Sequence, residues 1–114
     1  MRALAVYGTL RPGESNHWLV RQIAGEWVSG TVRGYEFEIG WGPVEGFPGF
    51  LLDKGGQDVT VEVLISNHMD DHLQEIDDFE GPGYRRVECI VTLDDGRLMD
   101  SWIYEAVPDV ADED

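Results

Sequence analysis

Apolar and polar residues alternate with a period of two along much of this chain, as is typical of β-strands with one buried face. The strictest alternation is Y-E-F-E-I at residues 35–39. Further strands are predicted at residues 3–6, 26–32, 50–52, 59–65, 85–93 and 98–104. The segment D-D-G-R between the last two has the composition of a hairpin turn.

Two segments have helical spacing instead. The first is predicted at residues 17–24, where Ser15 or Asn16 can cap the helix. The second is predicted from residue 67 to about residue 79, and the G-P-G of residues 81–83 ends it. Two helices among six or seven strands, most of them joined as hairpins, indicate an α+β domain with a largely antiparallel sheet or a small barrel.

One acidic residue departs from the pattern of the second helix. At about 100° per residue, the apolar positions gather on one side and most acidic positions face solvent, with Asp77 on the flank. Glu80 falls within about 20° of Leu73, among the core positions, if the helix continues that far. There, low dielectric and the negative end of the helix dipole would both raise its pKa and make it a better base. Alternatively, Glu80 swings outward or pairs with Arg85 or Arg86.

The segment Y-G-T-L-R-P-G at residues 7–13 joins the first strand to the first helix. Such a turn leaves backbone N–H groups unpaired near a helix N-terminus, where they can hold an anion or a polarised carbonyl oxygen. Gly8 and Gly13 do not have the spacing of a dinucleotide fingerprint or of a P-loop. Taken by itself, the segment fits a plain tight connection better than a binding site.

The charge of the chain narrows the range of partners. It carries 23 acidic and 8 basic residues, a net charge of −15, which repels nucleic acids and anionic membranes. No apolar run is long enough to span a bilayer, and the first residues lack the features of a signal peptide. The single cysteine, Cys89, is expected to be a small buried apolar residue.

From these properties we expect a cytoplasmic protein that is a monomer or a weak homodimer. We expect it to bind neither nucleic acid nor membrane. We expect one domain over residues 1–107 and a frayed acidic tail at residues 108–114.

Metal sites are poorly supported. Asp77, Asp78 and Glu80 form a possible cluster, but their spacing is not that of an EF-hand loop and Asp78 points away on a helix. His68 and His72 are four residues apart, yet the residues between them lack the glutamate of a zinc-protease motif. We therefore expect neither a metal nor another cofactor.

Four short motifs follow one another along the chain. They are Y-G-T-L-R-P-G at residues 7–13 with N-H at 16–17, L-x-x-I-D-D-F-E-G at 73–81, Y-R-R-V at 84–87 and W-I-Y at 102–104. Together they resemble the γ-glutamylcyclotransferase-like family, and the resemblance covers nearly the whole chain. The opening Y-G-T-L and the D-D-F-E at the end of the helix look closest to the γ-glutamylamine cyclotransferase branch.

This resemblance implies a fold and a reaction. The fold is a small mixed, mostly antiparallel β-barrel of five to seven strands with two main helices packed outside. In the reaction, the α-amine of a small γ-glutamyl substrate attacks its own γ-carbonyl, so that 5-oxoproline forms and an amine or peptide leaves. Glu80 matches the catalytic glutamate of the family. The candidates for substrate binding are Tyr7, Gly8, Thr9, Leu10, Tyr84 and Tyr104.

These roles have a physical basis. An α-ammonium is not a nucleophile, so a carboxylate must take its proton. Closing a five-membered ring is intramolecular, so holding the substrate folded lowers the barrier without a metal or a covalent intermediate. The N–H groups around Gly8, Thr9 and Leu10 can stabilise the oxygen of the tetrahedral intermediate. The hydroxyls of Tyr7 and Tyr104 either contact the substrate or cap the pocket.

Two departures from the family pattern bear on the substrate. Residues 61–65 are V-E-V-L-I, where family members commonly carry Gly-Glu followed by an aromatic residue, and the loop at residues 40–49 is rich in glycine and contains a tryptophan. Two hypotheses follow. The first is a cyclotransferase acting on a small γ-glutamyl amine or γ-glutamyl amino acid. The second is a non-catalytic member that binds a small ligand or a protein partner in the same pocket.

Overall fold

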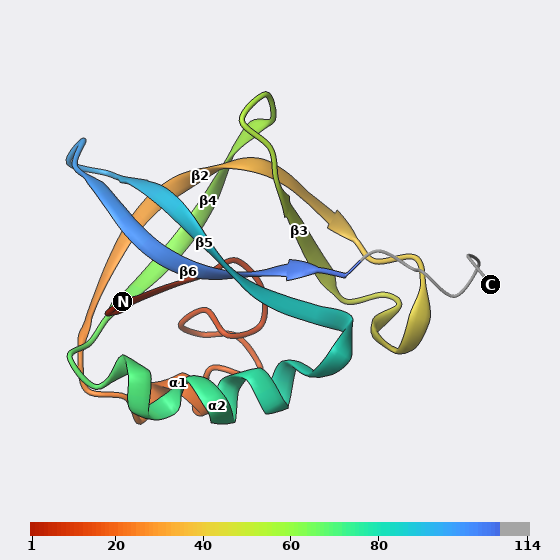
Figure 1. Ribbon diagram of the computed structural model, residues 1–114, viewed down its shortest axis with the longest axis horizontal. Helices are drawn as coiled ribbons and strands as arrows, with labels where there is room; N and C mark the ends of the chain where they lie inside the picture. Colours follow the sequence, from red (N-terminus) through yellow and green to blue (C-terminus); the bar gives the residue numbers. More distant parts are fainter. Residues whose placement is uncertain (108–114) are drawn as a thin grey trace.

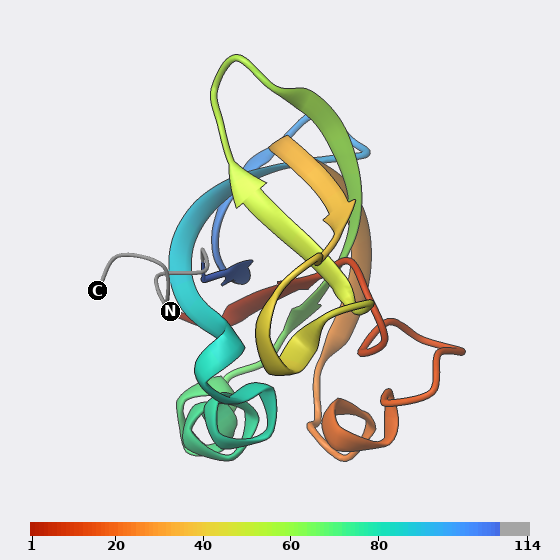
Figure 2. The same ribbon diagram turned by 90° about the vertical axis from the view of Figure 1, so that its right-hand side faces the viewer.

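A single six-stranded sheet, curled on itself, forms the body of the molecule, and two helices lie together on one side of it (Figure 1, Figure 2). The structure, a computed structural model, describes residues 1–107. The predicted tail at residues 108–114 lies outside this range. The elements in chain order are β1 (Ala3–Val6), α1 (Trp18–Arg21), β2 (Glu26–Glu38), η1 (Gly42–Val44), β3 (Pro48–Leu52), β4 (Gln57–Ile65), α2 (Met69–Glu80), η2 (Gly81–Gly83), β5 (Tyr84–Leu93) and β6 (Leu98–Ala106).

Five of the strands close into a barrel. Their order is β2-β4-β1-β6-β5, and β5 returns to β2 through the pairs Gly30–Leu93 and Thr31–Thr92. β3 pairs with β2 and extends the sheet beyond the barrel. Every strand pair is antiparallel except β1 with β6. The predicted fold class, a small mixed and mostly antiparallel barrel with two helices outside, is confirmed.

β1 is buried on both faces because two apolar cores meet at it. Ala3 and Ala5 belong to a core built from the strands alone, which fills the barrel. Leu4 and Val6 belong to a second core, which includes the apolar residues of α1 and α2. This double burial explains why residues 3–6 form an uninterrupted apolar run, whereas strands with one exposed face alternate.

β2 corrects the sequence prediction, which divided this region into strands at residues 26–32 and 35–39. The strand is continuous from Glu26 to Glu38. Gly34, interpreted as part of a break, instead allows the sheet to pack closely, because a Cβ at this position would lie 2.3 Å from the carbonyl oxygen of Leu51. Residues 50–52 and 59–65 likewise belong to somewhat longer strands, β3 and β4.

The first helix is shorter than predicted. Its α-helical part covers only Trp18–Arg21 rather than residues 17–24. Asn16 does not cap it, because its side-chain amide donates to the hydroxyl of Thr9. The side chains of Asn16 and His17, in front of the helix, instead contact Thr9 and Leu10 in the turn.

The second helix continues to Glu80, which is the condition under which this residue was predicted to lie among the core positions. It begins at Met69, two residues later than predicted, and Ser66 rather than Asn67 accepts the backbone N–H of His68 in front of it. Leu73 and Ile76 are buried against the barrel. No helix within residues 1–107 is long and apolar enough to cross a membrane.

Candidate active site

A pocket of about 220 Å³ opens where the end of β1, the end of α2 and the loop before β3 come together. All seven residues that the sequence analysis singled out lie in its wall. The lining residues are Ala5, Val6, Tyr7, Gly8, Thr9, Leu10, Asn16, Val44, Phe47, Pro48, Phe79, Glu80, Tyr84 and Tyr104. Of these, Glu80 carries the only charged side chain. The structure thus brings the Y-G-T-L turn, the glutamate and the two later tyrosines to one place.

The turn after β1 is held by its carbonyl groups. The carbonyl of Gly8 accepts from the N–H and the Nε of Arg11, and the carbonyl of Thr9 accepts from the N–H of Asn16. The carbonyl of Leu10 accepts from Nδ1 of His17 at 2.8 Å. By contrast, the N–H groups of Gly8, Thr9 and Leu10 donate to no described residue. Three residues of the pocket wall therefore carry backbone N–H groups that have no partner within residues 1–107, and such groups can bind an anion or an oxyanion.

Glu80 is the last residue of α2, and its side chain is partly buried in the pocket wall. Burial raises the pKa of its carboxyl group to about 7. The alternative in which Glu80 pairs with Arg85 or Arg86 is wrong, because Arg85 lies 3.4 Å from Glu105 and Arg86 binds Asp77. A carboxylate with this pKa can take or give a proton near neutral pH.

The three tyrosines of the pocket direct their hydroxyls to the protein itself. Tyr7 donates to the backbone carbonyl of Tyr104 at 2.8 Å, and Tyr84 donates to the carbonyl of Pro48 at 2.6 Å. Burial and then the neighbouring Glu80 raise the pKa of Tyr84 to about 12, so its phenol is neutral. Burial likewise raises the pKa of Tyr7. Their rings form the pocket wall while their hydroxyls fasten neighbouring segments to one another.

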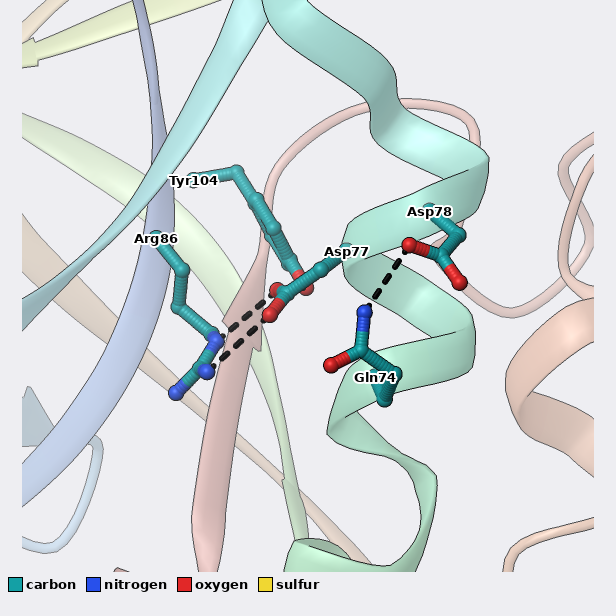
Figure 3. Close-up of polar contacts among 5 residues, drawn as sticks. All are labelled: Gln74, Asp77, Asp78, Arg86 and Tyr104. Atoms are coloured by element: carbon teal, nitrogen blue, oxygen red, sulfur yellow. Dashed lines mark hydrogen bonds and ion pairs between the residues drawn. The ribbon is translucent and has the colours of Figure 1, made fainter.

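The sequence analysis missed the contacts of Asp77, which holds the hydroxyl of Tyr104, a residue of the pocket wall. The wheel placed it on the flank of α2, but its carboxylate accepts two hydrogen bonds from Arg86, at 2.9 and 3.1 Å, and one from the hydroxyl of Tyr104 at 2.6 Å. Figure 3 shows Asp77 facing Arg86 and Tyr104, whereas its neighbour Asp78 points to Gln74 on another side of the helix.

Asp77 thus ties the last turn of α2 to β5 and β6. The hydrogen bonds from Arg86 are the main reason why the pKa of Asp77 is lowered. No local pattern in the sequence links a helix residue to partners 9 and 27 positions later.

The metal alternative finds no support in the described part of the chain. No group of three or more His, Cys, Asp or Glu side chains within residues 1–107 could hold an ion. Asp77 and Asp78, the other members of the suggested cluster with Glu80, have separate hydrogen-bond partners.

Comparison with known families decides the assignment. The family model described as gamma-glutamyl cyclotransferase, AIG2-like, matches residues 4–114. The chain belongs to this family.

One characterised relative and one solved structure share about a quarter to a third of their aligned residues with the chain. The chain is 31% identical over 110 residues to the gamma-L-glutamyl-butirosin B gamma-glutamyl cyclotransferase of Niallia circulans, covering 91% of this chain and 66% of that protein. It is 26% identical to YkqA from Bacillus subtilis, with a TM-score of 0.72 over 92% of this chain and 35% of that one. The chain thus spans about two thirds of the first relative's length and about a third of the second's.

A further comparison shows the cyclotransferase fold alone. An AIG2-like protein from Mus musculus is 24% identical, with a TM-score of 0.68 over 98% of this chain and 81% of that chain.

Proposed function

We propose that this member of the γ-glutamyl cyclotransferase family converts a small γ-glutamyl amine or γ-glutamyl amino acid to 5-oxoproline and a free amine. The observation that carries the proposal is the position of Glu80, a partly buried carboxyl group with a pKa of about 7 in a pocket wall. The same wall includes Gly8, Thr9 and Leu10, whose backbone N–H groups have no partner within residues 1–107. A pocket with one base and separate donors for an oxyanion suits an intramolecular acyl transfer.

In this proposal Glu80 is the general base. Its carboxylate takes a proton from the α-ammonium of the γ-glutamyl group, and the free amine then attacks the γ-carbonyl carbon. A C–N bond closes the five-membered ring, and the carbonyl oxygen becomes an oxyanion. When the tetrahedral intermediate collapses, the original amide C–N bond breaks. Glu80 gives its proton to the leaving nitrogen as this bond breaks, and the ring nitrogen releases its second proton to water. A neutral lactam and the free amine result, and Glu80 is again a carboxylate.

The N–H groups of Gly8, Thr9 and Leu10 are the donors for the developing negative charge. They also suit the α-carboxylate of the substrate, since the described wall of the pocket offers no Lys or Arg side chain for it. The rings of Tyr7, Tyr84 and Tyr104 restrict the space around the glutamyl chain. That restriction favours the folded conformation from which the ring closes.

The second candidate function, a non-catalytic member that binds a ligand in the same pocket, rests on one point. A carboxylate at this place can also form an ion pair with the α-ammonium of a bound γ-glutamyl compound without reacting with it. Binding without turnover would be its signature.

The experiment that separates the two is an NMR time course with a panel of γ-glutamyl amines and γ-glutamyl amino acids, in which 5-oxoproline is observed directly. We expect turnover by the native protein and a loss of at least about 100-fold in Glu80→Gln. Glu75→Gln, the same change at an exposed position of the same helix, is the control and should retain full activity.

Full activity in Glu80→Gln would refute the proposed base. Saturable binding of the γ-glutamyl compounds to the folded native protein, without 5-oxoproline, would establish the binding function instead.

A further inference from the structure

Two exposed aromatic side chains line the pocket, and a third packs against one of them. Phe47 and Phe79 line the pocket, yet 50% and 41% of their surfaces remain exposed. Trp18 is 52% exposed and packs edge-on against Phe79, with 5.7 Å between ring centroids. We call these three residues the aromatic rim. Exposed aromatic surface next to a pocket is typical of a place that a ligand covers.

The backbone of the loop that presents Phe47 is fixed by hydrogen bonds to the β2 and β5 regions of the chain. The carbonyl of Phe47 accepts the N–H of Ile39 at 2.9 Å, and the carbonyl of Pro48 accepts the hydroxyl of Tyr84 at 2.6 Å. Val44, in the same loop, packs so closely on Gly83 that a Cβ there would lie 2.7 Å from it. Figure 2 shows this loop, in yellow, beside the end of α2. Phe47 is therefore held in place although its ring is half exposed.

The charges around the pocket disfavour leaving groups that carry a carboxylate. Among the described lining residues there is no Lys or Arg side chain, and Glu80 is the one charged group. Arg11, beside the turn, already donates to the carbonyl of Gly8 and lies 3.9 Å from Glu14. The whole chain has a net charge of −15. A leaving group with its own carboxylate would find no cation in the pocket wall to compensate it and would be repelled by this field.

We propose that the aromatic rim binds the leaving group, and that the site prefers γ-glutamyl amides of amines that carry an aromatic or other apolar group and no carboxylate. This inference rests on the proposed function, because it names the substrate class of the same site. The glutamyl half occupies the inner pocket at Glu80 and the turn, and the amine half lies across Phe47 and Phe79. The loop of residues 40–49 then determines specificity through Phe47.

Three matched substrates test the preference. γ-Glutamyl-2-phenylethylamide has the aromatic ring, γ-glutamyl-phenylalanine adds only a carboxylate to it, and γ-glutamyl-ethylamide removes only the ring. We expect kcat/KM for the phenylethylamide to exceed both others by about tenfold or more, since an aromatic contact and an uncompensated charge each change binding by that order. Equal values for the phenylethylamide and the ethylamide would overturn the inference, and so would a preference for γ-glutamyl-phenylalanine.

Variants of the aromatic rim test whether its side chains cause the preference for the aromatic amide. In Phe47→Ala and in Phe79→Ala we expect the ratio of kcat/KM for the phenylethylamide to that for the ethylamide to fall about fivefold to tenfold. Leu98→Ala, which removes a 70% exposed side chain outside the pocket wall, is the control and should leave the ratio unchanged. An unchanged ratio in both rim variants would refute the assignment of the rim.

A second copy of the chain is the competing occupant. If the rim were a dimer interface, both rim variants would change the mass measured by sedimentation equilibrium and would lower kcat/KM for all three substrates equally, which would overturn the proposal. Failure of the proposed function itself would look different, because no substrate would then be turned over. Titration of the three compounds into the native protein, followed by NMR, would then decide by their order of affinity whether the rim still selects the aromatic amide.

Discussion

Two carboxylates on the last turn of α2 lie three residues apart and have opposite surroundings. Asp77 accepts three hydrogen bonds from Arg86 and Tyr104, and these contacts lower its pKa. Glu80 has no such partner within residues 1–107, and burial raises its pKa to about 7. The difference arises from what faces each side chain, because both are carried by the same helix.

The comparison shows how the carboxylate proposed as the base is kept in place. A base needs a poorly stabilised negative charge, which weakens the packing of the helix that carries it. Asp77 supplies the opposite, a well-satisfied charge three residues earlier that fastens the same helix to β5 and β6. Arg86 itself lies 4.2 Å from the ring centre of Trp102, which supports the guanidinium from the barrel side. Asp77 thus anchors the helix, and Glu80, three residues later, is the proposed base.

The largest predicted effect concerns the pH dependence of turnover. Glu80 must be ionised to accept a proton, so kcat/KM should fall as the pH drops through about 7, and at pH 5 about one hundredth of the plateau value should remain. Asp77→Asn should leave this midpoint in place, because burial rather than Asp77 shifts the pKa of Glu80. Initial rates between pH 5 and 9 measure both. A midpoint near 4.5 in the native protein would mean that the reacting carboxyl group is solvated.

The next effect concerns stability. Asp77→Asn removes the charge that Arg86 and Tyr104 bind, and we expect it to lower the free energy of unfolding by about 2 kcal/mol. Asp78→Asn is the matched control on the adjacent, exposed position and should change it by less than about 0.5 kcal/mol. Urea denaturation followed by circular dichroism measures both. Similar losses in the two variants would contradict the assigned role of Asp77.

The smallest predicted effect is a gain of stability, whereas Asp77→Asn causes a loss. The native protein holds a proton on Glu80 up to about pH 7, whereas the unfolded chain releases it near pH 4.5, so ionisation of this group destabilises the fold as pH rises between these values. Glu80→Gln removes this penalty. We therefore expect it to be more stable than the native protein by about 1–2 kcal/mol at pH 8 and equally stable at pH 4. Unfolding curves at the two pH values test this, and a loss of stability at pH 8 would show that the carboxylate makes a stabilising contact.

Much of the arrangement follows from local patterns in the sequence. The strand alternation and the turns predicted a largely antiparallel sheet or a small barrel, and the resemblance to the family implied the mixed barrel that the structure has. The helical periodicity placed Glu80 inward, and α2 does continue to that residue. The resemblance to the family grouped the turn, the glutamate and the tyrosines, which the structure brings to one pocket. Their roles in substrate binding and catalysis stay predictions.

Other features depend on contacts between distant parts of the chain. Gly34 allows an uninterrupted strand because the backbone of Leu51 lies against it, and no local signal distinguishes this from a turn. The partners of Asp77, and the approach of Phe47 to the end of α2, arise only when the barrel closes. Side chains on a helix flank have several possible partners, and tertiary packing selects among them.

The pairing of β1 with β6 has a consequence for the order of assembly. Tyr7, at the start of the site, donates its hydroxyl to the carbonyl of Tyr104, 97 positions later, and β1 lies directly beside β6. During synthesis on the ribosome, the turn after β1 emerges long before this strand is available, and the helix with Glu80 also precedes it. The barrel closes and the pocket acquires its wall only when β6 is inserted, so a nascent chain holds an unpaired β1 edge until then. Such delayed, long-range closure slows folding and leaves an aggregation-prone edge that a chaperone would protect.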